Sequence, residues 1–452
     1  MAQRLVVVGA DAAGMSAAHQ ALRTARAAGR DLDVVAVEMT DDVSYSACGI
    51  PYWMAGDVEA ADALVARTAA QHRAAGIDLR LRTEATALDL DRGEVEVRDH
   101  ASGTTTRLGF DDVVLATGAA PIQPEWARGI DGVLPVKTLA DGAAWRQVLE
   151  RRPDCALVVG GGYIGVEVAE AFARRGLTTT LVTRGAEPMS GSFEHHMGAL
   201  VRQALEKVGV RVVTGTEVTG LDGGRDGQVA AACLDGQEMQ ADVVALGLGV
   251  RPRVGLATAA GLAAGRHGGL VPDGRQRLAD GVWAAGDCCE VWDRLLESHW
   301  YVPLGTHANK AGRVAGTNLG GGDACFPGIV GTAITRAGEA EVARTGLTRY
   351  WAQRRGLDVL EVRMDSTTAS GYMPQADPVT VWVLGERGSG RLLGCQLVGG
   401  RGAGKRIDTV ATALWAGLTA QDVAMSDLAY APPFSPVWDP VQIACRKLAE
   451  RL

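Results

Sequence analysis

The stretch "RLVVVGADAAGMSAAHQALRTA", residues 4–25, reads as a buried apolar strand, a tight glycine turn and an alanine-rich helix. It is followed by "LDVVAVE", residues 32–38, a second apolar strand that ends in an acidic residue. This spacing is typical of a βαβ unit whose helix N-terminus holds a pyrophosphate while the acidic residue binds the ribose. Gly9, Gly14 and Glu38 are therefore the first expected nucleotide-binding residues.

A second copy of the pattern, "CALVVGGGYIGVEVAEAFARRG", occupies residues 155–176 and has all three glycines. Two copies about 150 residues apart make a chance match improbable. The next apolar strand ends in a threonine and an arginine, where an NADH-binding unit usually has a carboxylate. The residues expected at this second nucleotide site are Gly160, Gly162, Tyr163, Ile164, Gly165, Thr183 and Arg184.

Two residues in these copies qualify the interpretation. Asp11 replaces the middle glycine of the first pattern and would place a negative charge near the phosphates. Arg184 can pair with the 2′-phosphate of NADPH, which favours NADPH over NADH at the second site. The alternatives are parallel-sheet units that bind nothing and an arginine that is simply exposed at a strand end.

Three shorter segments add to the expected nucleotide sites. "VVLATGAAP" (113–121) and "VVALGLGVRP" (243–252) are strands that run into glycine turns, which allow a ligand to approach the backbone closely. "GVWAAGDCCEV" (281–291) is a strand that stops at an aspartate, which can accept a hydrogen bond from a sugar or ribityl hydroxyl or serve as a plain turn residue. The residues expected to contact cofactor here are Thr117, Gly118, Gly249, Gly286 and Asp287.

Composition narrows the functional classes. The chain of 452 residues has a formal net charge of −8, so it has no general attraction to nucleic acid or to an anionic membrane surface. Its start lacks a signal-peptide pattern, and we expect a cytoplasmic protein. The eight cysteines include no CxxC pair, so the sequence predicts neither a disulfide framework nor a metal site.

The segment "SYSACGIPYW", residues 44–53, contains a single cysteine, Cys48, among small residues. A cysteine near a helix start or an electron-poor ring has its thiolate favoured, and the thiolate is the species that attacks disulfides. Cysteine is also a common buried small residue, so an inert Cys48 is the alternative.

The order of these motifs, together with "PLGTHANKAGRVAGTNLGG" and "LAYAPPFSPVWDP", resembles the flavin-dependent pyridine nucleotide–disulfide oxidoreductases over nearly the whole chain. Within them it looks most like the single-cysteine group of coenzyme A-disulfide reductases, NADH oxidases, NADH peroxidases and polysulfide reductases. In two-cysteine relatives the partner of Cys48 would stand at Trp53, so an internal redox disulfide is excluded. The resemblance implies that Cys48 cycles through a sulfenic acid or a mixed disulfide.

The resemblance also implies FAD on the first unit, with Ser44 among its contacts, NADPH or NADH on the second, and a homodimer with shared active sites. Tyr372 and Tyr430 are similar to two tyrosines that in coenzyme A-disulfide reductases are thought to reach the other subunit's active site, where a phenol can protonate a departing thiolate. Arg23 is a candidate for a coenzyme A phosphate.

The sequence and the resemblance together predict an α/β fold with two interleaved Rossmann-like dinucleotide-binding domains and a C-terminal α+β dimerisation domain. The favoured function is NAD(P)H-dependent reduction of coenzyme A disulfide or a related small disulfide. The alternatives are an NAD(P)H oxidase or peroxidase, a polysulfide or persulfide reductase, and a non-enzymatic redox-sensing flavoprotein. The expected boundaries are 1–115 and 245–325 for the FAD domain, 116–244 for the NAD(P)H domain, and 326–452 for the dimerisation domain.

Overall fold

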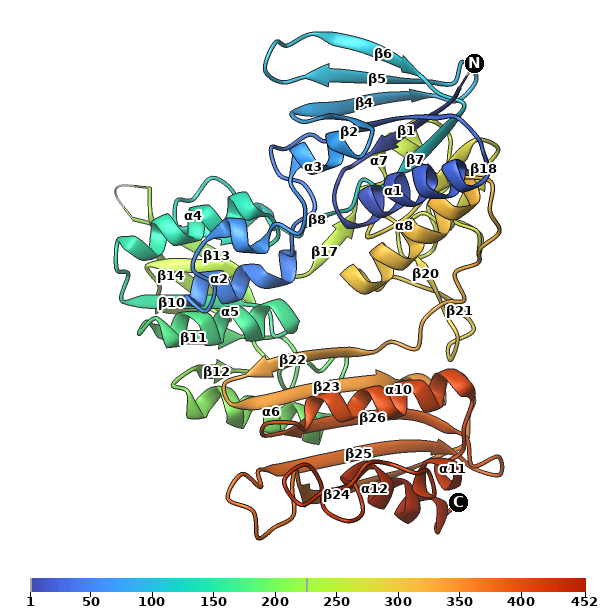
Figure 1. The fold of residues 1–452 in the computed structure, drawn as a ribbon. Coiled ribbons are helices and arrows are strands. Elements are labelled where there is room, and N and C mark those ends of the chain that lie inside the picture. Colours follow the sequence, from blue (N-terminus) through green and yellow to red (C-terminus); the bar gives the residue numbers. More distant parts are fainter. Residues whose placement is uncertain (1, 225–226) are drawn as a thin grey trace.

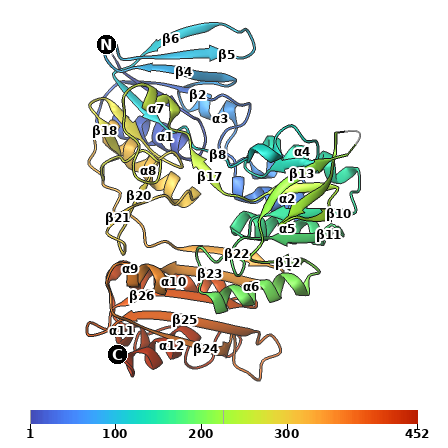
Figure 2. The same cartoon turned by 180° about the vertical axis from the view of Figure 1, so that it is seen from behind.

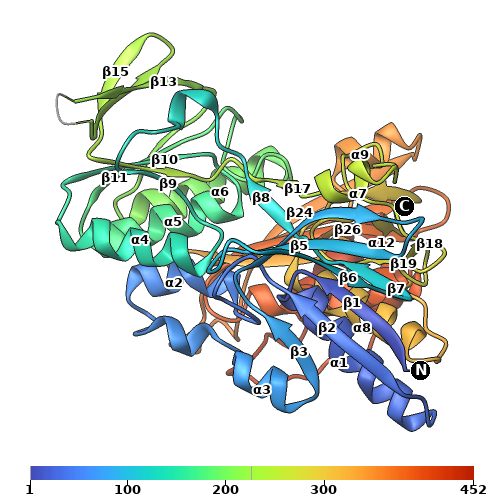
Figure 3. The ribbon, with the colours of Figure 1, turned by 90° about the horizontal axis from the view of Figure 1, so that it is seen from above.

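The computed structural model describes residues 2–224 and 227–452, and it divides into three units (Figures 1 and 2). In Figure 1 the first unit lies at the top, the second at the left and the third at the bottom. Figure 3, seen from above, shows the second unit projecting sideways from the other two. The predicted fold class is confirmed. Within the described part of the chain, no helix is both long enough and apolar enough to cross a membrane.

The first unit combines two stretches of chain that lie far apart in the sequence. A six-stranded sheet takes four parallel strands from the first stretch and two from the second. The last four residues of β1 and β2 and the last three of β7 are apolar and buried, as expected for strands covered on both faces. The order across the sheet is β18 (Arg277–Ala279), β19 (Val282–Ala284), β7 (Asp112–Leu115), β1 (Gln3–Val8), β2 (Leu32–Val37) and β3 (Ile77–Arg80).

Helices and small sheets complete the first unit. An antiparallel three-stranded sheet lies at the outer end of the unit (Figure 1), and a two-stranded ribbon leads towards the third unit. These elements are β4 (Thr83–Asp89), β5 (Glu94–Asp99), β6 (Thr105–Gly109), β20 (Val291–Asp293), β21 (Ser298–Trp300), α1 (Ala12–Ala27), α3 (Ala69–Ala74), α7 (Gly255–Ala259) and α8 (Gly305–Leu319). Helix α2 (Ile50–Ala55) comes from the same stretch of chain but packs against the second unit.

The second unit has a five-stranded parallel sheet flanked by helices and a three-stranded antiparallel sheet. The chain enters and leaves it through the antiparallel pair β8 (Ala119–Pro121) and β17 (Val250–Pro252). Its elements are β9 (Val133–Pro135), β10 (Cys155–Val159), β11 (Thr178–Val182), β12 (Arg211–Val213), β13 (Val218–Gly223), β14 (Val229–Leu234), β15 (Gln237–Gln240), β16 (Val243–Leu246), α4 (Leu139–Glu150), α5 (Tyr163–Arg174) and α6 (His195–Lys207).

Strand β16 crosses the boundary expected between residues 244 and 245. It pairs with β10 and β9 through Leu246, so the whole strand belongs to the second unit. The chain leaves this sheet only at the glycine turn around Gly247 and Gly249, because parallel pairing continues until that turn redirects the backbone.

The third unit is an antiparallel five-stranded sheet with helices packed against it. Helix α6 of the second unit also contacts this sheet, and buried side chains of both units belong to one continuous apolar cluster. The sheet order is β22 (Ala333–Ala337), β23 (Ala340–Gly346), β26 (Leu392–Gly399), β25 (Pro378–Glu386) and β24 (Val359–Thr367), and the helices are α9 (Arg349–Arg354), α10 (Ile407–Ala416), α11 (Ala420–Ala424) and α12 (Pro440–Ala449).

Both glycine turns are built by the same close contact. A Cβ on Gly14 would lie 1.9 Å from the carbonyl oxygen of Gly9, and a Cβ on Gly165 would lie 1.8 Å from that of Gly160. Gly9 and Gly160 also have positive φ angles of 100° and 112°. Only glycine satisfies both demands without strain, so each helix can start directly against its strand.

Helices α1 and α8, from the two stretches of the first unit, pack closely. A Cβ on Gly312 would lie 2.2 Å from the carbonyl oxygen of Ala13, and one on Gly316 would lie 2.3 Å from that of Ala17. Backbone therefore touches backbone along this contact. Because the glycines at these positions carry no side chain, α1 and α8 pack closely enough to hold the two stretches together in one unit.

We predict that Gly316→Ala destabilises the protein by about 1–3 kcal/mol, because the added methyl forces α8 away from α1. Thermal unfolding of the flavin-loaded protein measures the effect. Gly220→Ala is the matched control, since a Cβ there meets nothing within 4 Å. Equal midpoints for the two variants would contradict the close packing of α1 against α8.

Candidate active site

A cavity of about 2390 Å³ lies where the three units meet. Ordinary small-molecule pockets occupy roughly 300–1,000 Å³, so this cavity has room for more than one ligand. Most residues singled out from the sequence line it. They are Gly9, Arg23, Glu38, Ser44, Cys48, Thr117, Gly118, Gly160, Gly162, Tyr163, Ile164, Thr183, Arg184, Gly249, Gly286 and Asp287.

Four of the expected residues lie outside the cavity wall. Gly14 and Gly165 stand behind it, where they allow the helix starts to approach the strands. Tyr372 and Tyr430 lie in the third unit with 75% and 46% of their surfaces exposed. Within a single chain, these two tyrosines are not brought to Cys48.

Two carboxylates lie at the first glycine turn, Asp11 within the turn and Glu38 at the end of the next strand. Glu38 accepts a hydrogen bond from the Ala10 N–H at 2.9 Å, which fixes it beside the turn. Asp11 accepts one from the Tyr45 N–H at 3.3 Å. Burial and the nearby Glu38 raise the pKa of Asp11 to about 6. Asp11 is therefore more easily protonated than an ordinary aspartate, which lessens its repulsion of a phosphate.

The second glycine turn ends beside Thr183 and Arg184. Thr183 is buried, and its hydroxyl accepts a hydrogen bond from the Gly185 N–H at 3.3 Å. The Arg184 side chain is 76% exposed and lies 3.5 Å from Glu217. An exposed ion pair of this kind contributes only about 0–1 kcal/mol, so the guanidinium can be redirected to a phosphate at little cost.

Cys48 lies in a short 3₁₀ turn, Ala47–Gly49, immediately before α2. Part of the Cys48 side chain is exposed to the cavity, although protein atoms closely surround the rest of it. This burial and the carboxylate of Glu167 raise the pKa of the Cys48 thiol, while Lys137 opposes them. The expectation that the thiolate is favoured is therefore not met by the neighbouring side chains.

Helix α2 is anchored in the core shared by the second and third units. Ile50 and Met54 are fully buried, and Trp53 is 7% exposed. A Cβ on Gly142 of α4 would lie 2.7 Å from the Trp53 ring. Trp53 thus holds the Cys48 turn against the second unit.

Glu167 and Lys137 line the same cavity but were missed from the sequence. Glu167 accepts a hydrogen bond from the Thr335 hydroxyl at 2.6 Å, and burial raises its pKa. Its position four residues after Tyr163, on the same helix face, was an available signal. Lys137 pairs with Asp287 at 2.9 Å across 150 residues of sequence, which no local pattern reveals.

A basic wall lines the cavity beside α1. It includes Arg23, Arg67 and Arg313, none of which forms a salt bridge within the described residues. His19 lies 2.8 Å from both Arg67 and His72. Burial and Arg67 lower the pKa of His19 to about 4, so its ring is neutral at pH 7. Arg67 and Arg23 act on the neutral ring of His19, and Arg313 lines the same cavity, so this wall can attract an anionic group such as phosphate.

We predict that Glu167→Gln lowers the pKa of the Cys48 thiol, because the carboxylate charge that raises it is removed. Glu167 is ionised at the higher pH where the thiol titrates, so removing its charge makes the thiolate easier to form. The pH dependence of Cys48 alkylation, followed by peptide mass spectrometry, measures this shift. Glu206→Gln, an exposed change on α6, is the control, and an unchanged or upward-shifted curve for Glu167→Gln would contradict the account.

Two family models match the chain. The pyridine nucleotide-disulphide oxidoreductase model matches residues 3–311, and the dimerisation domain model of the same family matches residues 334–440. The chain belongs to this family. It is therefore an NAD(P)H-dependent flavin oxidoreductase that uses FAD and a pyridine nucleotide. Both glycine turns line the cavity at the start of a helix, and this fits the pyrophosphates of these dinucleotides.

Three relatives show the range of activities in the family. The chain is 34% identical to the NAD(P)H coenzyme A polysulfide/persulfide reductase of Pyrococcus horikoshii and 30% identical to the NADH oxidase of Methanocaldococcus jannaschii, over 99% of each chain. It superposes on the NAD-dependent persulfide reductase of A. fulgidus with a TM-score of 0.95 at 34% identity, covering 99% of this chain and 83% of that one.

Proposed function

We propose that the protein reduces coenzyme A disulfide, or a closely related small disulfide, through a mixed disulfide on Cys48. The observation that carries this proposal is the position of Cys48 in the cavity that also receives both glycine turns and the basic wall. Coenzyme A has phosphates for the arginines and a long arm that ends in sulfur. Arg23, Arg67 and Arg313 would hold the phosphates while the sulfur reaches Cys48.

The exchange step needs the Cys48 thiolate. It attacks one sulfur of the disulfide, a bond forms between Cys48 and that sulfur, and the other coenzyme A leaves as a thiolate that takes up a proton. Bound FAD and the pyridine nucleotide supply the two electrons that return Cys48 to the thiol and release the second coenzyme A. Lys137 would favour the thiolate, and Glu167 would disfavour it when ionised.

The third unit supports a homodimer with shared active sites. Tyr372 and Tyr430 are exposed on one subunit and would enter the cavity of the other, where a phenol O–H can donate to the departing sulfur. The exposed apolar surface around them, with Phe434 76%, Val437 67% and Trp438 41% exposed, is the kind of surface that a partner subunit covers.

Reduction of a coenzyme A persulfide or of polysulfide is the second candidate. The observation in its favour is that two relatives, each 34% identical to the chain, are persulfide reductases by name. The same cavity, basic wall and Cys48 would serve that reaction, with a persulfide sulfur in place of the disulfide.

The test of the proposal is anaerobic NADPH consumption by the flavin-loaded protein with coenzyme A disulfide, counting the thiols released. We expect two thiols to be released per NADPH consumed. This activity should be lost in Cys48→Ser, because exchange requires the Cys48 sulfur, and kept in Cys325→Ser, a control at another exposed cysteine. Sulfide release from polysulfide without response to the disulfide would favour the second candidate. Consumption only with oxygen or peroxide would contradict both reductase proposals.

Arg184 gives a separate prediction about the pyridine nucleotide. Arg184→Ala is expected to raise the KM for NADPH by about tenfold or more, the loss of roughly 1.4 kcal/mol, because the 2′-phosphate loses its cation. The KM for NADH should stay within about twofold. Steady-state kinetics with both nucleotides measures this, with the exposed residue Arg211 changed to Ala as control. A parallel change for both nucleotides would contradict the assignment of NADPH.

A further inference from the structure

Two loops of the third unit carry the exposed tyrosines. The loop of residues 368–377, between β24 and β25, carries Tyr372, and the loop of residues 425–439, between α11 and α12, carries Tyr430. We call these two loops the tyrosine arm. Their tips bury little surface within their own chain, so apolar packing of the tips does not fix their positions.

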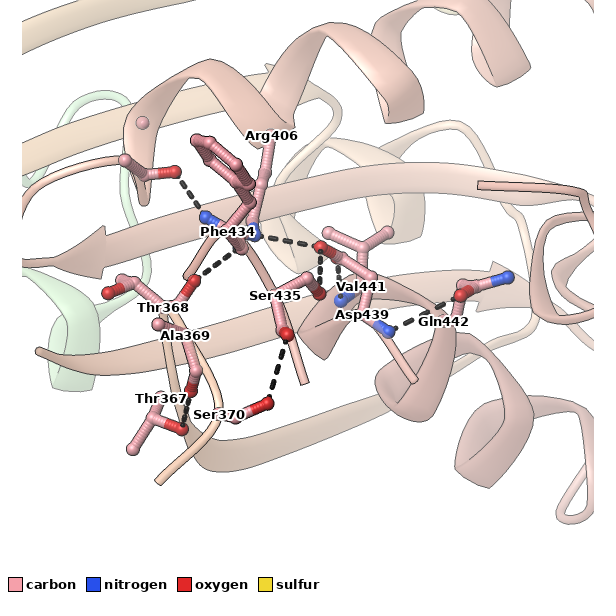
Figure 4. Close-up of polar contacts among 12 residues, drawn as sticks. Thr367, Thr368, Ala369, Ser370, Arg406, Phe434, Ser435, Asp439, Val441 and Gln442 are labelled. Atoms are coloured by element: carbon pink, nitrogen blue, oxygen red, sulfur yellow. Dashed lines mark hydrogen bonds and ion pairs between the residues drawn. The ribbon is translucent and has the colours of Figure 1, made fainter. Parts of the chain in front are cut away.

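The two loops are joined by direct hydrogen bonds, and Figure 4 shows the one between Ser370 and Ser435. The Ser370 N–H donates to the carbonyl oxygen of Pro432 at 2.9 Å, and the Ser370 hydroxyl donates to that of Ser435 at 3.3 Å. Ser370 and Ser435 are both buried. These bonds hold the two loops together, although the loops are separated by more than forty residues of sequence.

Arg406, just before α10, holds both loops at once (Figure 4). Its Nη2 donates to the carbonyl oxygens of Thr368 and Phe434, each at 2.7 Å, and its Nε donates to the Asp439 carboxylate at 2.8 Å. The Arg406 and Asp439 side chains are only 12% and 13% exposed. One planar guanidinium thus ties the start of the first loop to Phe434 and Asp439 of the second, which a lysine could not do in the same geometry.

The Asp439 carboxylate also stabilises the start of α12, whereas Arg406 does not. This carboxylate accepts a hydrogen bond from the Val441 N–H at 2.9 Å and caps α12. A change at Asp439 would uncap this helix as well as free the arm. Arg406 is therefore the residue whose replacement acts most selectively on the arm.

A buried ion pair is a weak source of stability, because desolvation of the two charges offsets most of their attraction. Such pairs can instead select one conformation, and Arg406 donates to a carbonyl oxygen of each loop as well as to the Asp439 carboxylate. Resting on the function proposed above, we propose that Arg406 is a positioning residue that sets the tyrosine arm in the orientation in which Tyr372 and Tyr430 enter the partner subunit's cavity.

The proposal predicts an effect in the partner subunit. In a heterodimer of one Cys48→Ser chain and one chain with Cys48, the working cavity receives its tyrosine arm from the Cys48→Ser chain. Arg406→Gln in that chain is expected to lower kcat by about 10- to 100-fold, the usual cost of a misplaced group. The same change in the chain that has Cys48 is expected to have a much smaller effect, because its arm enters the inactive cavity.

The measurement uses differently tagged, flavin-loaded heterodimers in the anaerobic disulfide assay, together with stopped-flow reduction of the flavin by NADPH. Flavin reduction should keep its rate in both placements, since the arm does not serve that step. Arg406→Lys in the Cys48→Ser chain should give an intermediate loss, and it replaces Arg406→Gln if that variant fails to fold. Arg387→Gln, an exposed change in the same unit, is the control.

Each other outcome overturns the proposal. Equal losses in both placements would mean that Arg406 supports only its own subunit, and no loss in either would mean that the arm needs no clamp. A protein that is monomeric during turnover would exclude action across subunits. The function itself is tested separately by the Cys48→Ser homodimer, because retained disulfide reduction there would contradict the thiol mechanism and with it the role of the arm.

Discussion

The contact between a helix start and the carbonyl oxygen at the end of its strand sets the structure of both nucleotide units. At Gly14 and at Gly165, a Cβ would lie within 2 Å of that oxygen. The missing side chains bring each helix N-terminus to the carboxyl end of its sheet, where backbone N–H groups and the helix dipole favour a pyrophosphate. The cavity exists because the two turns face it together and the third unit lies beside them.

The chemistry of the site depends on how Cys48 is held. Helix α2 belongs to the first unit in sequence but is packed into the core of the other two, through Ile50, Trp53 and Met54. This packing keeps the sulfur within the influence of a lysine that favours the thiolate and a half-buried glutamate that disfavours it. The reactivity of the sulfur is therefore a balance of protein charges and of what binds in the cavity, and it is not a property of the cysteine turn by itself.

Much of this arrangement could be predicted from local sequence. The glycine turns, Glu38, Arg184 and Cys48 each sit in a short pattern with a physical reason, and the structure brings all of them to one cavity. Other features depend on distant residues, such as the pairing of Lys137 with Asp287 or of Arg406 with two loops. The opposing effects of burial, Glu167 and Lys137 on the Cys48 thiol act through space and have no local pattern. The domain boundary expected after residue 244 lies two residues before the end of β16 at Leu246, because the local sequence does not mark where strand pairing stops.

The most direct test of the central claim is the mass of the intact protein after treatment with coenzyme A disulfide in the absence of oxygen. The account predicts one coenzyme A per chain, located on the peptide that contains Cys48, and its release when NADPH is added. No adduct, an adduct on another cysteine, or an adduct that NADPH does not release would contradict the role of Cys48.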